Sequence, residues 1–115
     1  MLTVYHNSAC SKSNGVCELL KQHQQPTDII EYLNTPPTQE TLLLLLQQLN
    51  MKPSELIRRN EPIFKTLFES ETLLTEEACL NAMLQHPILI ERPIVVKDGK
   101  AMIARPPELV LQWIE

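Results

Sequence analysis

The chain has 115 residues, 43% of them hydrophobic, and this size suits one domain with a modest core. Its formal net charge of −4 provides no basic surface field, which argues against general nucleic-acid binding. The longest apolar run, Leu42 to Leu46, is far too short to cross a bilayer, and the N-terminus shows no signal-peptide pattern. The composition therefore predicts a cytoplasmic protein that does not act in a membrane.

Cys10 lies where a predicted strand joins a predicted helix. The residues from Leu2 to Tyr5 form a short β-prone run, and apolar residues recur at helical spacing from Ser11 to about Gln24. The unpaired N–H groups and the positive dipole end at a helix start favour an anion, and a thiolate is an anion. This position therefore predicts a lowered pKa and a nucleophilic role for Cys10.

The other two cysteines are predicted to be structural. The three cysteines, at positions 10, 17 and 79, form an odd set without paired spacing, so we expect no disulfide framework. Cys17 would lie roughly 10 Å from Cys10 along a helix, whereas a disulfide needs Cα atoms within about 7 Å. Cys17 and Cys79 both fall in apolar helical patterns, so we expect both to pack in the core.

The first and last thirds of the chain carry the strand signals. The segment from Thr27 to Tyr32 predicts a second strand, which forms a parallel βαβ unit with the two elements before it. Near the C-terminus, Ile94–Val96 and Ala101–Ala104 flank Asp98-Gly99, a strong signal for a hairpin turn. A short helix from Glu108 to Ile114 is predicted to follow.

The middle of the chain, from Thr38 to about His86, is predicted to be helical, with Thr38 and Thr75 as helix caps. Five consecutive leucines in the first of these helices predict burial on more than one face. A short helix is expected from Pro53 through Arg59. Three aromatic or aliphatic residues beyond it are expected to be core anchors: Phe64, Leu67 and Phe68.

The predicted element order is β-α-β, a helical insertion at about residues 37–88, and then β-β-α. A parallel βαβ unit combined with an antiparallel hairpin gives an α/β fold with a mixed four-stranded sheet. We expect residues 1–115 to form a single domain that contains the insertion.

The residues exclude several kinds of site. With only two glycines, the chain has no glycine-rich phosphate loop, and His6 beside Cys10 supplies at most two ligands, so no metal site is expected. Three arginines fall at predicted element boundaries, where they would offer planar hydrogen-bond donors to an oxyanion: Arg58, Arg92 and Arg105. A thiol combined with converging arginines indicates an anion site.

Four stretches resemble the glutaredoxin-coupled arsenate reductase family, in the same order and over nearly the whole chain. They are His6–Cys10, Leu56–Asn60, His86–Val96 and Arg105-Pro106, and the Arg-Pro-Ile-Val-Val block within the third is quite specific. The resemblance implies a thioredoxin-like fold with a helical insertion. That implication agrees with the element order predicted from the residues themselves.

The resemblance also implies roles for individual residues. Cys10 corresponds to the catalytic cysteine of the family, and His6 to the histidine close to that nucleophile. Three arginines correspond to the oxyanion-binding arginines of the family: Arg58, Arg92 and Arg105. Pro93 falls where thioredoxin-like folds keep a cis proline facing the active thiol, so the Arg92–Pro93 peptide bond is expected to be cis.

The activity implied by the resemblance is reduction of arsenate to arsenite, with glutathione as co-substrate, glutaredoxin as partner protein and no bound cofactor. Two alternatives remain open at this point. One is a general glutathione-linked thiol oxidoreductase, for which the arginines would be superfluous. The other is a redox-responsive regulator that binds RNA polymerase, although Ser13 stands where such sensors carry the second cysteine of a Cys-x-x-Cys pair.

Overall fold

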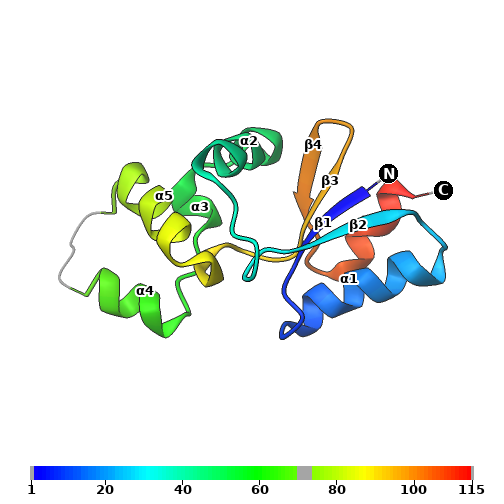
Figure 1. Ribbon diagram of the computed structural model, residues 1–115, viewed down its shortest axis with the longest axis horizontal. Helices are drawn as coiled ribbons and strands as arrows, with labels where there is room; N and C mark the ends of the chain where they lie inside the picture. Colours follow the sequence, from blue (N-terminus) through cyan, green and yellow to red (C-terminus); the bar gives the residue numbers. More distant parts are fainter. Residues whose placement is uncertain (1, 70–73, 115) are drawn as a thin grey trace. The chain divides into compact units, whose positions relative to one another are not determined.

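The computed structural model describes residues 2–69 and 74–114 (Figure 1). The chain divides into two compact units, which we call the sheet unit (Met1–Thr35 with Arg92–Glu115) and the helical unit (Pro36–Glu91). The helical unit coincides closely with the insertion expected at about 37–88. That the two units form a single domain stays a prediction.

The sheet unit is built on a four-stranded sheet with the strand order β2-β1-β3-β4. Its elements are β1 (Leu2–His6), α1 (Ser11–Gln22), β2 (Thr27–Glu31), β3 (Ile94–Lys97), β4 (Lys100–Ile103) and the 3-10 helix η2 (Pro107–Trp113). Strand β1 pairs in parallel with β2 and antiparallel with β3, which in turn pairs antiparallel with β4. The predicted α/β class and mixed sheet are confirmed.

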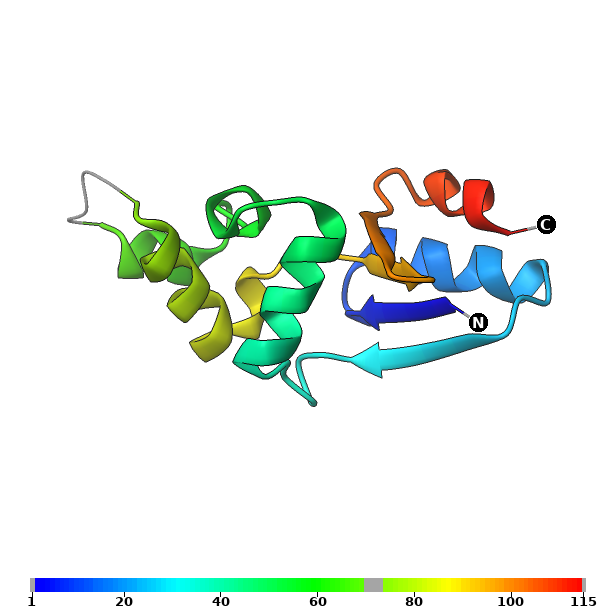
Figure 2. The ribbon, with the colours of Figure 1, turned by 90° about the horizontal axis from the view of Figure 1, so that it is seen from above.

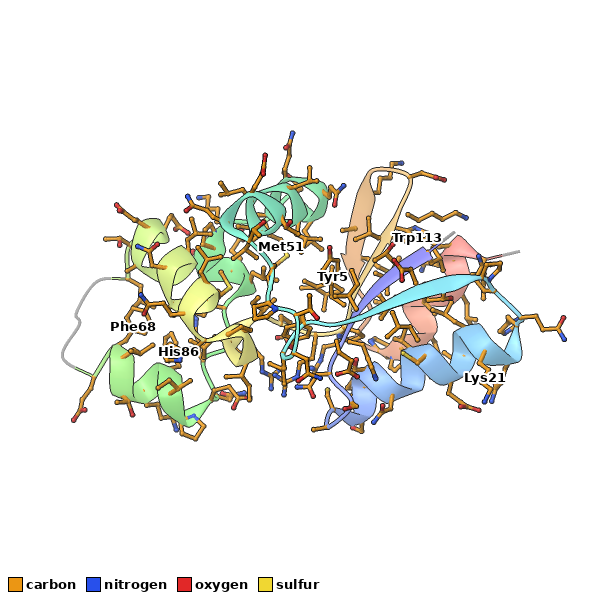
Figure 3. The ribbon with its side chains drawn as sticks, in the orientation of Figure 1. Tyr5, Lys21, Met51, Phe68, His86 and Trp113 are labelled. Atoms are coloured by element: carbon orange, nitrogen blue, oxygen red, sulfur yellow. The ribbon has the colours of Figure 1, made fainter. Side chains whose placement is uncertain are left out.

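The core of the sheet unit lies between one face of the sheet and the pair formed by α1 and η2, which pack against each other (Figure 2). It is made of fully buried residues from both strands and helices: Leu2, Val4, Val16, Leu20, Val95, Ala104 and Val110. Trp113 packs against this core from η2 (Figure 3). Because α1 is anchored along this core, its first turn is held at the end of β1.

The turn between β3 and β4 confirms the predicted hairpin. Asp98 and Gly99 have φ angles of 51° and 79°, so both adopt the left-handed conformation that a tight two-residue hairpin requires. Helix α1 is two residues shorter than predicted, because Gln24 turns to a φ of 53° and leaves the helical path. The last element winds as a 3-10 helix and not as an α-helix.

The helical unit confirms both predicted helix caps. Its elements are α2 (Gln39–Leu49), α3 (Pro53–Leu56), α4 (Pro62–Leu67), α5 (Glu76–Gln85) and the 3-10 helix η1 (Pro87–Leu89). The side-chain oxygen of Thr38 accepts a hydrogen bond from the N–H of Thr41 at 3.1 Å, and Thr75 accepts one from Ala78 at 3.0 Å. Each bond satisfies a backbone donor that a helix start leaves open.

The expectation that the leucine run is buried on more than one face is wrong. Leu42, Leu45 and Leu46 are buried, but Leu43 and Leu44 are 46% and 52% exposed. Consecutive residues turn by about 100° on a helix, so five leucines in a row must point all round it. Here α2 buries a single stripe, as an ordinary amphipathic helix does.

The predicted helix over Pro53–Arg59 is too long, because α3 ends at Leu56. Ile57 is extended and forms an isolated antiparallel bridge with Ile90. The N–H of Arg58 donates to the carbonyl of Leu89 at 2.7 Å, and the N–H of Glu91 donates to that of Leu56 at 3.3 Å. These backbone groups therefore bond across to a distant segment and not along a helix.

The expected core anchors of the following turn are also wrong, because α4 has no buried residue and Leu67 is exposed. The rings of Phe64 and Phe68 pack on each other instead, with their centroids 4.8 Å apart. The guanidinium of Arg59 lies over the Phe64 ring at 5.7 Å. Throughout residues 2–69 and 74–114, no helix is long and apolar enough to cross a membrane.

Candidate functional site

The loop between β1 and α1 places Cys10 at the start of the helix. The side-chain carbonyl of Asn7 accepts a hydrogen bond from the N–H of Ala9 at 2.9 Å, and the Asn7 backbone carbonyl accepts one from Cys10 at 3.0 Å. Cys10 is the N-cap residue, with an extended backbone, and its own carbonyl accepts the first helical bond, from Asn14. The predicted position of the thiol is therefore confirmed.

The surroundings of the Cys10 thiol favour its charged form. Partial burial by itself raises the pKa of this thiol, but hydrogen bonds from the Ser13 N–H, the Arg92 side chain and the Lys12 N–H outweigh that effect. The positive charge of Arg92 adds to them, so the net pKa of Cys10 is lowered. The helix start and one arginine thus stabilise the thiolate together, as the sequence predicted for the helix start.

Arg92 and Arg105 come from the ends of β3 and β4. Arg92 is 9% exposed and precedes Pro93 through a cis peptide bond, so the predicted cis bond is confirmed. Arg105 follows β4, and its Nη1 donates a hydrogen bond to the carbonyl of Arg92 at 3.1 Å. The Arg105–Pro106 bond is also cis, which the sequence analysis did not anticipate. Arg105 is therefore held on the backbone of Arg92, and the Arg92 side chain reaches the Cys10 thiol.

His6 ends β1 and is largely buried. Its Nδ1 lies 2.5 Å from the hydroxyl oxygen of Ser13 and 3.5 Å from the sulfur of Cys17, and its Nε2 lies 3.6 Å from a carboxylate oxygen of Glu31. These contacts place the ring beside the first turns of α1, next to the residues that surround the nucleophile. The catalytic role of His6 stays a prediction.

Arg58 belongs to the helical unit, where it forms ion pairs with two carboxylates. Its Nη1 is hydrogen-bonded to Glu91, and its Nε lies 3.4 Å from a carboxylate oxygen of Glu61. Neighbouring Arg59 instead donates to the backbone carbonyl of Ser54 at 2.8 Å, besides covering the Phe64 ring. The role of Arg58 as an oxyanion ligand stays a prediction.

The two remaining thiols differ from Cys10. Burial, followed by the charge of Glu31, raises the pKa of Cys17, and burial likewise raises the pKa of Cys79. Cys79 is fully buried, as predicted. Cys17 is only half-buried and lines an open pocket of about 460 Å³ between α1 and β2, so the expectation of simple core packing is incomplete.

Sequence reasoning missed the partners of the predicted site residues. The sequence indicates only that Ser13 stands at the second-cysteine position of a Cys-x-x-Cys pair. In the structure its side chain is fully buried and its hydroxyl contacts His6. Glu31 was missed because its approach to His6 depends on the register between β1 and β2. No group of three or more metal-ligating side chains occurs within the described part of the chain.

A thiol at the start of α1, a cis Arg92–Pro93 bond before β3 and a mixed four-stranded sheet together mark a thioredoxin-like fold. Within that class the chain belongs to the ArsC family, whose model matches residues 5–113.

Two relatives and one solved structure illustrate this membership. The chain is 46% identical over 112 residues to the uncharacterized protein YfgD of Escherichia coli K12. The matched region covers 96% of this chain and 94% of YfgD. The chain is 38% identical over 111 residues to an arsenate reductase of the same strain, covering 96% of this chain and 79% of the relative. An arsenate reductase structure from Vibrio cholerae matches with a TM-score of 0.89 and 41% identity, covering 96% of this chain and 95% of that one.

Proposed function

We propose that this protein is a cytoplasmic arsenate reductase that takes electrons from glutathione and a glutaredoxin, with Cys10 as its nucleophile. The observation that carries the proposal is the position of the Cys10 thiol at the N-cap of α1, where helical N–H groups and Arg92 favour the thiolate. Membership of the ArsC family and the 38% identity to an arsenate reductase support the choice of substrate.

In the first chemical step the Cys10 thiolate attacks the arsenic of arsenate, and one arsenic-bound oxygen leaves as hydroxide or water. Arg92 offers a charged donor at the thiol, and Arg105, held on the Arg92 carbonyl, is a second proposed donor; both would neutralise the charge that develops on the oxygens. Arg58 is a third proposed ligand of the oxyanion, on the family resemblance alone. His6 is the proposed neighbour of the nucleophile.

The second step requires two electrons from a second thiol. Glutathione attacks the Cys10 sulfur, an S–S bond forms, and the electrons of the S–As bond reduce arsenic from the +5 to the +3 state as arsenite leaves. A glutaredoxin then reduces the mixed disulfide and restores the Cys10 thiol. The sequence of steps needs no metal or nucleotide, since the thiols supply both the nucleophile and the electrons.

The test is arsenite formation from arsenate in the presence of glutathione and a glutaredoxin. We expect activity from the wild-type protein and from Cys17→Ser, and complete loss of activity in Cys10→Ser. Cys17→Ser is the matched control, because it removes a thiol from the same helix whose pKa is raised and not lowered. Full activity in Cys10→Ser, or none in the wild type, would contradict the proposal.

A general glutathione-linked thiol oxidoreductase is the second candidate, because a low-pKa thiol at a helix start would serve that activity equally well. Reduction of a small mixed disulfide, measured without arsenate, separates the two. We expect this activity to be weak beside arsenate reduction. A regulator that binds RNA polymerase through a redox-sensitive dithiol is less well supported, because the Ser13 hydroxyl occupies the position of the second thiol.

A further inference from the structure

Ser13 is a buried polar residue that the proposed reaction does not use directly. It is the third residue of α1 and is fully buried. Its hydroxyl oxygen accepts a hydrogen bond from the N–H of Asn7 at 3.0 Å and lies 2.5 Å from Nδ1 of His6. One hydroxyl therefore bonds to the end of β1 and to the loop after it.

These contacts decide where the hydroxyl proton goes. A serine hydroxyl has one proton to donate, and a buried one needs an acceptor. Asn7 already donates to the Ser13 oxygen, so the proton points to another atom, and Nδ1 of His6 is the acceptor within reach. Nδ1 must then carry a lone pair, and a neutral His6 ring carries its own hydrogen on Nε2.

The other contacts of the ring agree with this tautomer. Nε2 faces a carboxylate oxygen of Glu31 at 3.6 Å, and Glu31 is the residue paired with His6 across β1 and β2. A hydrogen on Nε2 therefore points toward negative charge. The thiol of Cys17, 3.5 Å from Nδ1, can add a second, weaker donor on the lone-pair side.

The backbone of Ser13 acts on the nucleophile itself. Its N–H donates to the Cys10 sulfur, and this hydrogen bond is the largest of the contributions that favour the thiolate. The same residue thus holds the end of β1 with its side chain and the Cys10 sulfur with its main chain. Loss of the hydroxyl would free the first turn of α1 from β1 and let this N–H move away from the sulfur.

We propose that Ser13 is a positioning residue for the Cys10 nucleophile. Its hydroxyl donates to Nδ1 of His6 and thereby fixes both the tautomer of that ring and the direction of the Ser13 N–H toward the sulfur. In this arrangement His6 anchors the helix start. Its Nδ1 already accepts a hydrogen bond from the Ser13 hydroxyl, so this nitrogen is not open to take the Cys10 proton. The proposal deepens the proposed function, on which its catalytic meaning rests.

Four other charged or titratable residues lie near the helix start, and none of them is changed in the test. Arg92 faces the thiol from the start of β3, and Arg105 is held on the Arg92 carbonyl after β4. Lys12 lies in the same helical turn, and His6 lies at the end of β1. The variants of Ser13 replace none of these four residues.

The first experiment is long-range ¹H–¹⁵N NMR of the histidine rings in the wild-type protein at neutral pH. We expect the ring hydrogen of His6 on Nε2 and a lone pair on Nδ1, and we expect Cys17→Ala to leave this arrangement unchanged. In Ser13→Ala the tautomers should mix. A hydrogen on Nδ1 in the wild type would overturn the proposal, whether or not the Ser13 variant folds.

The second experiment measures the rate of Cys10 alkylation by iodoacetamide across pH, in the absence of arsenate. At pH values below the wild-type midpoint, Ser13→Ala should react about three- to tenfold more slowly, because the thiolate fraction falls tenfold for each unit by which the pKa rises. Ser11→Ala is the matched control, since Ser11 is exposed in the same helical turn. It should react as the wild type does.

Val16→Ala controls for a merely structural effect, because Val16 is fully buried in the same helix but carries no hydrogen bond to the site. It should lower thermal stability and leave the pH midpoint of alkylation unchanged. If Ser13→Ala alkylates within about twofold of the wild type, or if Val16→Ala shifts the midpoint equally, the positioning role is wrong. These results do not depend on arsenate, so they are distinct from a failure of the proposed reaction.

Discussion

At the scale of single residues, the pKa values of the three cysteines shift in different directions because their surroundings differ. Cys10 has helical N–H groups and Arg92 as donors, and these overcome the effect of its burial. Cys17 and Cys79 lie farther along helices, where backbone N–H groups are already bonded, and burial dominates. The place of Cys10 at the helix start therefore lowers the pKa of its thiol, whereas burial alone would raise it.

This difference predicts selective labelling. With one equivalent of iodoacetamide at neutral pH, Cys10 should be the main product, measured by peptide mass spectrometry. Because the pKa of Cys10 is lowered, its alkylation rate should level off as pH rises, at a lower pH than for an ordinary thiol. The rates of Cys17 and Cys79 should still rise at alkaline pH, because their pKa values are raised. Equal labelling of all three at neutral pH would contradict this.

The arginines predict a second result at this scale. Lysine keeps the charge of arginine but loses its planar pair of donors. Losing one charge-assisted hydrogen bond costs about 1.5–3 kcal/mol, or about 10- to 150-fold in kcat/KM for arsenate. We expect losses of this size for each of three variants: Arg58→Lys, Arg92→Lys and Arg105→Lys. Arg92→Lys should also raise the pKa of Cys10, because a directed hydrogen bond to the thiolate weakens.

Arg59→Lys is the matched control for these variants, since Arg59 bonds to the Ser54 carbonyl and covers the Phe64 ring. Arg59→Lys should lower the stability of the protein and leave kcat/KM for arsenate unchanged. If all three site variants stay within about twofold of the wild type, the oxyanion site is wrong and the thiol-reductase alternative takes its place. Loss in Arg92→Lys and Arg105→Lys without loss in Arg58→Lys would remove only Arg58 from the site.

At the scale of elements, the turn between β3 and β4 can be tested independently of function. Gly99 has a φ of 79°, and a Cβ added there would meet no atom within 4 Å, so a substitution acts through backbone conformation alone. Gly99→Ala should lower the free energy of unfolding by about 1 kcal/mol, measured by urea denaturation, because alanine disfavours positive φ. Gly99→Asn is the control and should lose less, since asparagine tolerates this conformation. An alanine variant as stable as the wild type would contradict the assigned turn.

The elements also show which features could be predicted from sequence. The cap residues Thr38 and Thr75 and the Asp98-Gly99 turn were predicted correctly, because each depends on bonds within three residues. The extended path of Ile57 was not predicted, because its bridge partner, Ile90, is distant in sequence and supplies the backbone bonds that a helix would otherwise supply.

The candidate site follows the same rule. The placement of Cys10 could be predicted because strand, turn and helix are consecutive in the chain. The contacts of the Ser13 hydroxyl and of Glu31 with His6 could not be predicted, since both depend on how α1 and β2 pack beside β1. The contact of Arg105 with the Arg92 carbonyl likewise required the pairing of β3 with β4.

At the scale of the whole molecule, the sheet unit should depend on the core beneath α1. Leu20 is almost completely buried in that core, so Leu20→Ala should lower the free energy of unfolding by about 2–5 kcal/mol in urea. Leu111→Ala is the control within the same unit, since Leu111 is 37% exposed, and it should cost less than about 1 kcal/mol. Equal losses in the two variants would mean that the core is wrongly placed.

The sheet unit is discontinuous in sequence, and this bears on how the protein is made. Strand β1 is a central strand whose neighbour β3 is encoded after the whole helical unit. A nascent chain leaving the ribosome therefore presents Cys10 and α1 long before Arg92 and Arg105 exist to join them. The helical N–H groups can act on the thiol once α1 forms, but its positive neighbour, Arg92, is translated only after the whole helical unit. We expect the thiol to be fully activated only when synthesis is nearly complete, so that unfinished chains carry a less reactive cysteine.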